Sequence, residues 1–203
     1  MKNILCYGDS NTFGFNPKDG SRYKKDERWT GVLSFLLGSD YKVIEAGFNN
    51  RTLYFKNASG LMQSGCAYFP KFIENYPSYD WVILALGVND TQFLYNATAD
   101  TFKSGMSDLV NTVRNYSDAK ILILGPSVIK KEVLATFFAE MFDEKSIEKS
   151  KIISDIYKEF AQQNNCYFID LNNVAQASEV DGLHYSVESH KKIAKAVYDT
   201  LLG

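Results

Sequence analysis

The chain has 203 residues, of which 45% are hydrophobic and 14% aromatic, so we expect one globular domain over residues 1–203. Its 22 Lys and Arg residues nearly balance 24 Asp and Glu residues, and no basic stretch is dense enough to bind phosphates, which argues against a nucleic-acid partner. Strand-like residues begin at Asn3, which leaves no room for a signal peptide, and no apolar run reaches transmembrane length. The three cysteines are far apart in the sequence and do not suggest disulfides. These features predict a cytoplasmic protein without a stable membrane anchor.

Short apolar runs alternate with segments of helical periodicity along the chain. The expected helices include three stretches with apolar residues at helical spacing, 106–113, 153–160 and 193–201. This alternation is typical of a parallel sheet with crossover helices on both faces, so the sequence predicts an α/β fold. The expected strands are five, namely Ile4–Tyr7, Tyr41–Ala46, Trp81–Leu86, Ile121–Leu124 and Tyr167–Leu171.

Glycines and polar residues follow four of these strands. The carboxyl ends of parallel strands meet at one edge of a sheet, where ligands bind near the switch in strand order. We therefore expect the loops after the strands to build one site at that edge. In chain order the four segments are Gly8-Asp9-Ser10-Asn11, Gly47, Gly87-Val88-Asn89-Asp90 and Asp181-Gly182-Leu183-His184.

Ser10 lies just after the first strand, so its hydroxyl can project from this edge. A neutral hydroxyl is a poor nucleophile and needs a base. Of the two histidines, His190 lies within the last amphipathic segment, where a surface or packing role is expected, whereas His184 lies in the loop before it. His184 follows Asp181 by three residues, which lets the carboxylate bind Nδ1–H and hold Nε2 toward Ser10.

Three groups at the same edge are candidate donors for an oxyanion hole, which acyl transfer requires. They are the backbone N–H of Ser10, the backbone N–H of Gly47 and the side-chain amide of Asn89. Each residue alone has a simpler structural explanation, because Ser and Asn commonly cap helices and Gly is common in turns. Their joint placement with a base and its carboxylate partner favours a hydrolytic site.

Together these segments resemble the blocks of the SGNH, or GDSL, hydrolase family, in the same order across almost the whole chain. The resemblance implies a flavodoxin-like three-layer α/β/α sandwich without metal or organic cofactor. It also implies Ser10 as nucleophile, His184 as base, Asp181 as the residue that orients it, and an oxyanion hole of Ser10, Gly47 and Asn89.

A closer similarity is to the arylesterase, perhydrolase and carbohydrate acetylesterase branch of that family. The branch favours short acyl groups, often acetyl, and commonly forms dimers or larger rings. We therefore expect a homo-oligomer that acts on small-molecule esters. The matching segments are 9–14 (DSNTFG), 28–33 (RWTGVL), 43–47 (VIEAG) with Arg51-Thr52, and 86–91 (LGVNDT).

Further residues near these loops are candidates for substrate binding. Asn11, Trp29 and Phe93 could contact the substrate, although ordinary packing explains the aromatic ones equally well. Arg51 either orients the second loop or meets a polar substrate. Residues 133–142 carry apolar side chains at helix-like spacing, so we expect a helix there that covers the pocket, meets another subunit or packs into the core.

Several alternative functions are compatible with the same residues. Within esterases they are a carbohydrate deacetylase acting on xylan oligosaccharides, a lysophospholipase or a thioesterase, and outside enzymes a non-catalytic small-molecule binding module. A phosphatase with Asp9 as phosphoryl acceptor would need a second acidic residue two positions later, where Asn11 stands. We assign Asp9 and Asp90 to loop hydrogen bonds. The sequence lacks a P-loop, a Gly-x-Gly-x-x-Gly fingerprint and a Gly-x-Ser-x-Gly elbow.

Overall fold

A computed structural model describes residues 1–55, 60–76 and 78–203 of the protein. Its central sheet has five parallel strands in the order β2-β1-β3-β4-β5. Each expected strand overlaps an observed one, which confirms the predicted α/β class. The strands are β1 (Lys2–Gly8), β2 (Tyr41–Gly47), β3 (Trp81–Ala85), β4 (Lys120–Gly125) and β5 (Tyr167–Asp170).

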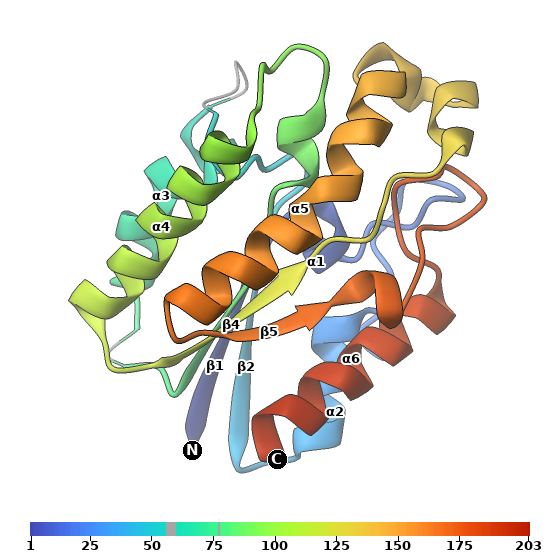
Figure 1. Ribbon diagram of the computed structural model, residues 1–203. Coiled ribbons are helices and arrows are strands. Elements are labelled where there is room, and N and C mark those ends of the chain that lie inside the picture. The colour runs from blue at the N-terminus through green and yellow to red at the C-terminus, as the bar shows by residue number, and fades with distance from the viewer. Residues whose placement is uncertain (56–59, 77) are drawn as a thin grey trace.

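Helices cover both faces of the sheet and complete a three-layer α/β/α sandwich, as predicted (Figure 1). Along β1, Ile4 and Cys6 point to the face covered by α2 and α6, whereas Leu5 and Tyr7 point to the face covered by α3, α4 and α5. The α-helices are α1 (Ser10–Phe13), α2 (Trp29–Leu37), α3 (Gly65–Ile73), α4 (Ala99–Tyr116), α5 (Glu144–Gln163) and α6 (Val187–Leu202).

Short 3₁₀ turns follow several strands at the carboxyl edge. They are η1 (Leu61–Gln63), η2 (Val88–Thr91), η3 (Lys131–Ala135), η4 (Phe137–Glu140) and η5 (Leu171–Asn173). The long helices that return from this edge begin at side-chain caps: Thr98 accepts the Thr101 N–H at the start of α4, and Asp143 accepts the Ser146 N–H at the start of α5. These caps fix where each loop ends and each crossover begins.

The strand register brings the ends of three strands together. Gly8, at the end of β1, is paired with Gly47 of β2 on one side and Ala85 of β3 on the other. The chain first moves outward from β1 to β2 and then crosses to β3, so the loops after β1 and β3 separate at the switch in strand order. Gly47 has no room for a side chain, because a Cβ there would lie 2.0 Å from the Phe13 nitrogen. The helix α1 therefore packs directly over Gly47.

The prediction of one helix over residues 133–142 is wrong. The structure has two separate 3₁₀ turns there, η3 and η4, joined at Thr136. Thr136 is extended, with φ −120° and ψ 175°, and its hydroxyl accepts the Phe138 N–H, so this residue caps the second turn instead of continuing the first. Val133 and Phe142 are buried in a small apolar cluster with Leu183. The apolar residues at helix-like spacing are therefore buried although they do not form a helix.

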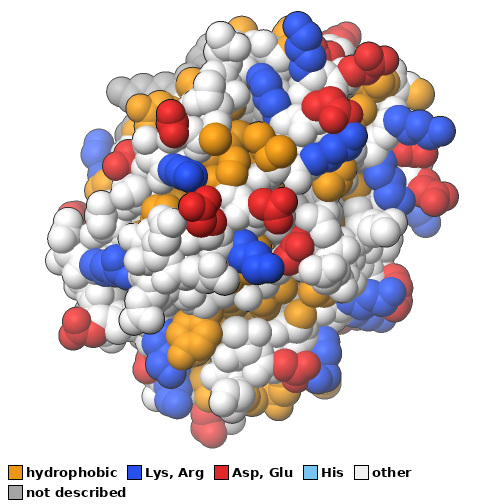
Figure 2. All heavy atoms as spheres, viewed as in Figure 1, with side chains coloured by type: hydrophobic (Ala, Val, Ile, Leu, Met, Phe, Trp, Pro, Cys, Tyr) orange, Lys and Arg blue, Asp and Glu red, His pale blue; other side chains and the backbone are white. Residues whose placement is uncertain are grey.

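Acidic and basic side chains are interspersed over the face that Figure 2 shows, without a large area of one sign. This mixture agrees with the formal net charge of −2. In the parts of the chain that the structure describes, we find no helix with both the length and the apolar character that crossing a membrane requires.

Candidate active site

Ser10 is the first residue of α1, immediately beyond the end of β1. Asp9 caps this short helix by accepting the Asn11 N–H at 2.9 Å, and Gly14 ends it in the left-handed conformation with φ 86°. Gly8 allows the tight turn into the helix, because a Cβ there would lie 2.0 Å from the Thr12 hydroxyl oxygen. The N–H of a first helical residue has no partner within its helix, so the Ser10 amide is placed to serve a ligand.

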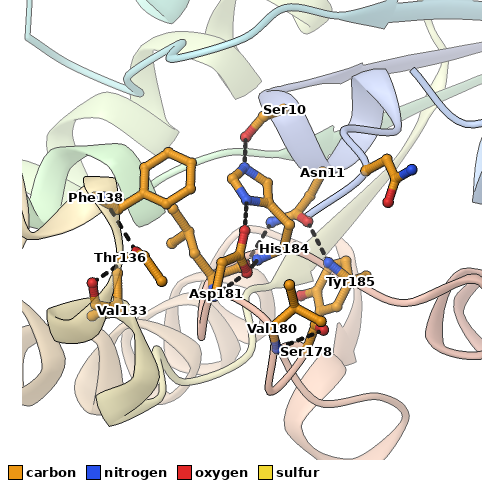
Figure 3. Close-up of polar contacts among 12 residues, drawn as sticks. Ser10, Asn11, Val133, Thr136, Phe138, Ser178, Val180, Asp181, His184 and Tyr185 are labelled. Carbon is orange, nitrogen blue, oxygen red and sulfur yellow. Dashed lines mark hydrogen bonds and ion pairs between the residues drawn. The ribbon is translucent and has the colours of Figure 1, made fainter. Parts of the chain in front are cut away.

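Ser10, His184 and Asp181 form a continuous hydrogen-bonded line, although 174 residues separate the serine from the histidine (Figure 3). The Ser10 Oγ lies 2.9 Å from His184 Nε2, and His184 Nδ1 lies 2.7 Å from Asp181 Oδ2. The other carboxylate oxygen, Asp181 Oδ1, accepts the backbone N–H groups of Leu183 and His184 at 3.0 and 2.9 Å. The structure thus brings together the three residues that the sequence singled out for catalysis.

The hydrogen bonds around Asp181 determine which ring nitrogen of His184 carries a hydrogen. Burial favours the neutral carboxyl, but the hydrogen bonds and charge of His184, with the Leu183 N–H, outweigh it and hold the pKa of Asp181 below its usual value. An ionised carboxylate can only accept, so Nδ1 of His184 carries a hydrogen. Nε2 is then free to accept the Ser10 hydroxyl proton.

Asn89, in the turn η2 after β3, lines the same pocket as Ser10 and His184. Its Nδ2 donates to the Arg51 carbonyl oxygen at 3.0 Å, and its Oδ1 accepts from Gln92 Nε2 at 3.3 Å. Gln92 also donates to Asn50 Oδ1 at 2.8 Å. Because an amide nitrogen carries two hydrogens, Asn89 keeps one donor for a ligand after its bond to Arg51.

A pocket of about 150 Å³ is lined by Ser10, His184 and Asn89. Two aromatic rings lie directly beside the base. The Phe15 ring centroid lies 4.2 Å from that of His184, and the Phe138 ring centroid lies 5.2 Å from it (Figure 3). The residues that line the pocket fall into a polar group and an apolar group. The polar group is Ser10, His184, Asn49, Asn50 and Asn89, and the apolar group is Phe15, Phe138, Met141, Phe142 and Leu183.

The chain matches the model of the GDSL-like lipase/acylhydrolase family over residues 6–192. It belongs to this family. A comparison with curated protein sequences gave no match. Together with the solved esterase structures described next, the family match confirms the prediction of an ester hydrolase.

Solved structures of two named esterases are similar over the full length of this GDSL-family hydrolase. The native aryl esterase of M. smegmatis is 29% identical with a TM-score of 0.90, and the alignment covers 100% of this chain and 99% of that one. Est24, a carbohydrate acetylesterase from Sinorhizobium meliloti, is 28% identical with a TM-score of 0.88 over the same shares of the two chains.

Asp9 and Asp90 hold loops of this GDSL-family hydrolase in place, as the sequence analysis assigned them. The Asp90 carboxylate accepts the N–H groups of Leu53, Tyr54 and Phe55 at 2.6, 2.9 and 3.4 Å, which joins the loop after β3 to the loop after β2. Burial raises the pKa of Asp90 to about 6 against these hydrogen bonds. Burial likewise raises the pKa of Asp9 to about 7 against the Asn11 N–H.

Three residues expected to contact the substrate do not line this pocket. Trp29 is 2% exposed and packs in the core between the sheet and α6, outside the pocket. Phe93 is 54% exposed and does not line the pocket either. Asn11 uses its side chain on the backbone of the His184 loop: its Nδ2 donates to the Leu183 carbonyl at 3.3 Å and its Oδ1 accepts the Tyr185 N–H at 3.2 Å.

The structure also decides between the two interpretations of Arg51. Its side chain is 2% exposed and bonds to backbone carbonyls, so it orients loops and does not meet a substrate. The pocket residues that sequence analysis missed are Phe15, Asn49 and Asn50. A signal for them existed, because Phe15 directly follows the Asp9–Gly14 segment and the asparagines lie two and three residues after Gly47.

Proposed function

We propose that this ester hydrolase cleaves short-chain carboxylic esters through an acyl-enzyme formed on Ser10. The observation that carries the proposal is the line of hydrogen bonds from Ser10 through His184 to Asp181, set in the wall of a pocket that also contains the Asn89 amide. Nucleophile, base and orienting carboxylate in this order are the requirement for acyl transfer to a serine hydroxyl.

In the first half of the reaction the Ser10 Oγ attacks the ester carbonyl carbon while His184 Nε2 takes the hydroxyl proton. The carbonyl electron pair moves to its oxygen and gives a tetrahedral oxyanion. When this intermediate collapses, the ester C–O bond breaks and His184 returns the proton to the departing alkoxide. Water then repeats the sequence on the acyl-enzyme and releases the carboxylic acid. Throughout, the Asp181 carboxylate holds the imidazolium by its Nδ1–H bond.

The oxyanion would be stabilised by the Ser10 N–H, the Gly47 N–H and the free N–H of Asn89. Ser10 supplies its donor from the start of α1, and Asn89 is fixed by its bonds to Arg51 and Gln92. Fixed donors lower the barrier because they need no reorganisation as charge develops.

The preference for short acyl groups rests on the walls of the pocket. The rings of Phe15 and Phe138 lie next to the His184 ring, and Phe142 also lines the pocket. An acetyl group is small enough to fit beside them. Asn49, which also lines the pocket, offers an amide group to a polar alcohol. This polar lining favours acetylated sugars as a second candidate beside aryl acetates, in keeping with the names of the two similar esterases.

The test compares wild-type protein with Ser10→Ala on p-nitrophenyl esters of increasing chain length and on peracetylated sugars. We expect turnover to be highest with acetate and to be lost in Ser10→Ala, with unchanged circular dichroism. A fluorophosphonate probe should label the wild type and not the variant. For Asn89→Ala, loss of one donor should lower kcat about 10²- to 10³-fold. Ester turnover that survives Ser10→Ala, or absent labelling of the wild type, would contradict the proposal and favour a binding module.

A further inference from the structure

Arg51 is a buried arginine that lies at the centre of the loops around the site. It is 2% exposed, and among the described residues its guanidinium forms no ion pair with a carboxylate. Burial lowers the pKa of Arg51 from its ordinary value. Placing a charged group here is therefore costly, and hydrogen bonds to the charge must compensate for the loss of water.

The side chain of Arg51 holds the ends of two strands. Its Nη1 donates to the carbonyl oxygens of Gly8 at 2.9 Å and Ala46 at 2.6 Å. Gly8 is the last residue of β1, two positions before Ser10, and Ala46 directly precedes Gly47 at the end of β2. The guanidinium therefore fixes the peptide segments that lead to two of the proposed oxyanion donors.

The backbone of Arg51 holds the third donor. Its carbonyl oxygen accepts from Asn89 Nδ2 at 3.0 Å, while its own N–H donates to the Phe48 carbonyl at 3.2 Å. The amide of Asn89 is planar, so one hydrogen bonded to Arg51 sets the direction of the other. The same residue thus contacts all three segments that carry the proposed donors.

We infer that Arg51 is the positioning residue of the oxyanion hole, which places the Ser10 N–H, the Gly47 N–H and the Asn89 amide relative to one another. The inference rests on the serine esterase function proposed above. Arg51 does not touch the substrate, because its exposed surface is nearly nil and it is not part of the pocket lining. It acts through the groups that do.

An arginine suits this position better than a lysine. Its Nε donates to the Met62 carbonyl at 2.9 Å while Nη1 serves Gly8 and Ala46, so the fork reaches carbonyls in different directions. The flat guanidinium also lies 4.4 Å from the centroid of the Tyr7 ring. A lysine has one nitrogen and cannot occupy both places, although it keeps the charge.

The inference predicts a particular kinetic effect. Oxyanion donors act on the transition state, so their displacement lowers kcat and leaves ground-state binding nearly unchanged. Arg51 is not among the residues that line the pocket, and KM should therefore change little. A residue that served only the stability of the fold would reduce the amount of active protein without changing the rate of each intact site.

The experiment measures kcat and KM of the full-length protein for p-nitrophenyl acetate in wild type, Arg51→Lys and Arg51→Gln. Rates are divided by the concentration of Ser10 that a fluorophosphonate labels at completion, so that unfolded protein does not count. Arg28→Lys is the matched control, because Arg28 is also largely buried but its guanidinium bonds to Glu45 of the edge strand β2 and to the Tyr23 carbonyl instead of to Gly8 and Ala46. Thermal unfolding followed by circular dichroism reports the stability of each variant.

We expect both Arg51 variants to lose about 10²-fold or more in kcat per labelled site with KM within about threefold, whereas Arg28→Lys keeps kcat within about threefold. If the Arg51 variants keep wild-type kcat per site, or if neither folds, Arg51 serves only the fold and the inference is overturned. If the wild type itself neither hydrolyses esters nor takes the label, the proposed function fails first, and the role of Arg51 falls with it.

Discussion

His190 gives this fold a specific sensitivity to acid. It lies in α6 with no exposed surface, its Nδ1 accepts the Trp29 N–H at 3.3 Å, and its Nε2 has no partner among the described residues. Burial, helped by the charges of His184 and Arg28, lowers the pKa of His190 from 6.5 to about 3. Protonation of His190 in the native protein is therefore disfavoured throughout the mildly acidic range.

The sign and size of the effect follow from proton linkage. Below pH 6.5 the unfolded chain binds a proton at His190 that the native chain does not, so the free energy of unfolding falls as the pH falls through this window. Integrated from about pH 7 to about pH 5, the loss is about 2 kcal/mol. The result is insensitive to the native pKa, provided that this value lies below about 4.

The assay compares wild type with His190→Asn, whose side-chain oxygen keeps an acceptor for the Trp29 N–H but does not titrate. Free energies of unfolding come from urea titrations at about pH 5 and pH 7. Asp9 and Asp90 have raised pKa values, so their contributions to stability fall as the pH rises and oppose that of His190 in the wild type. Because these contributions are common to both proteins, the difference between wild type and variant isolates His190.

We expect this difference to shift by about 2 kcal/mol in favour of the variant when the pH is lowered. The constant cost of the substitution, for instance from lost packing against the Tyr23 and Tyr185 rings, cancels in the comparison. Equal differences at the two pH values, within about 0.5 kcal/mol, would refute the reasoning and mean that His190 is protonated or solvated in the native protein.

Further predictions concern the site itself. In Gly47→Ala the added Cβ would lie 2.0 Å from the Phe13 nitrogen and displace α1. We therefore expect kcat/KM for an acetate ester to fall at least about 10²-fold. Activity near that of the wild type would show that α1 adjusts without loss of the site geometry. Asp181→Asn removes the charge that fixes the His184 tautomer and should lower kcat about 10⁴-fold in a stopped or continuous assay, and a loss below about tenfold would argue against the orienting role. Phe138→Ala should widen the apolar wall and raise the ratio of kcat/KM for butyrate over acetate roughly tenfold; an unchanged ratio would place the acyl group elsewhere.

The sheet could be predicted because its signal is local. Each buried strand is a short apolar run with a glycine or polar turn after it, and this pattern does not depend on what the strand packs against. The prediction of a helix over 133–142 was wrong because the signal there is not decided by the local apolar pattern alone. Apolar spacing there is equally compatible with two capped 3₁₀ turns, and the decision depends on whether the Thr136 hydroxyl caps the second turn, which spacing does not reveal.

The proposed catalytic residues could be selected because the chemistry restricts the choice of side chains. Only two histidines are available, and one of them follows an aspartate at a spacing that suits a shared hydrogen bond. Trp29 and Asn11 were assigned to the substrate by proximity in sequence to the same loops. Proximity does not say which way a side chain points, and both turn toward the protein: Trp29 into the core and Asn11 toward the backbone of the His184 loop.

Arg51 shows why the supporting residues are harder to predict than the catalytic ones. A catalytic group is defined by its own reactivity, whereas a positioning group is defined by the atoms that face it, here the carbonyls of Gly8 and Ala46 at two neighbouring strand ends. Those carbonyls face one another only after β1 and β2 pair in the observed register. The sequence therefore left two roles open for Arg51, and burial beneath the loops selects between them. It follows that Asp90, whose carboxylate binds three successive N–H groups of the adjacent loop, belongs to the same supporting framework.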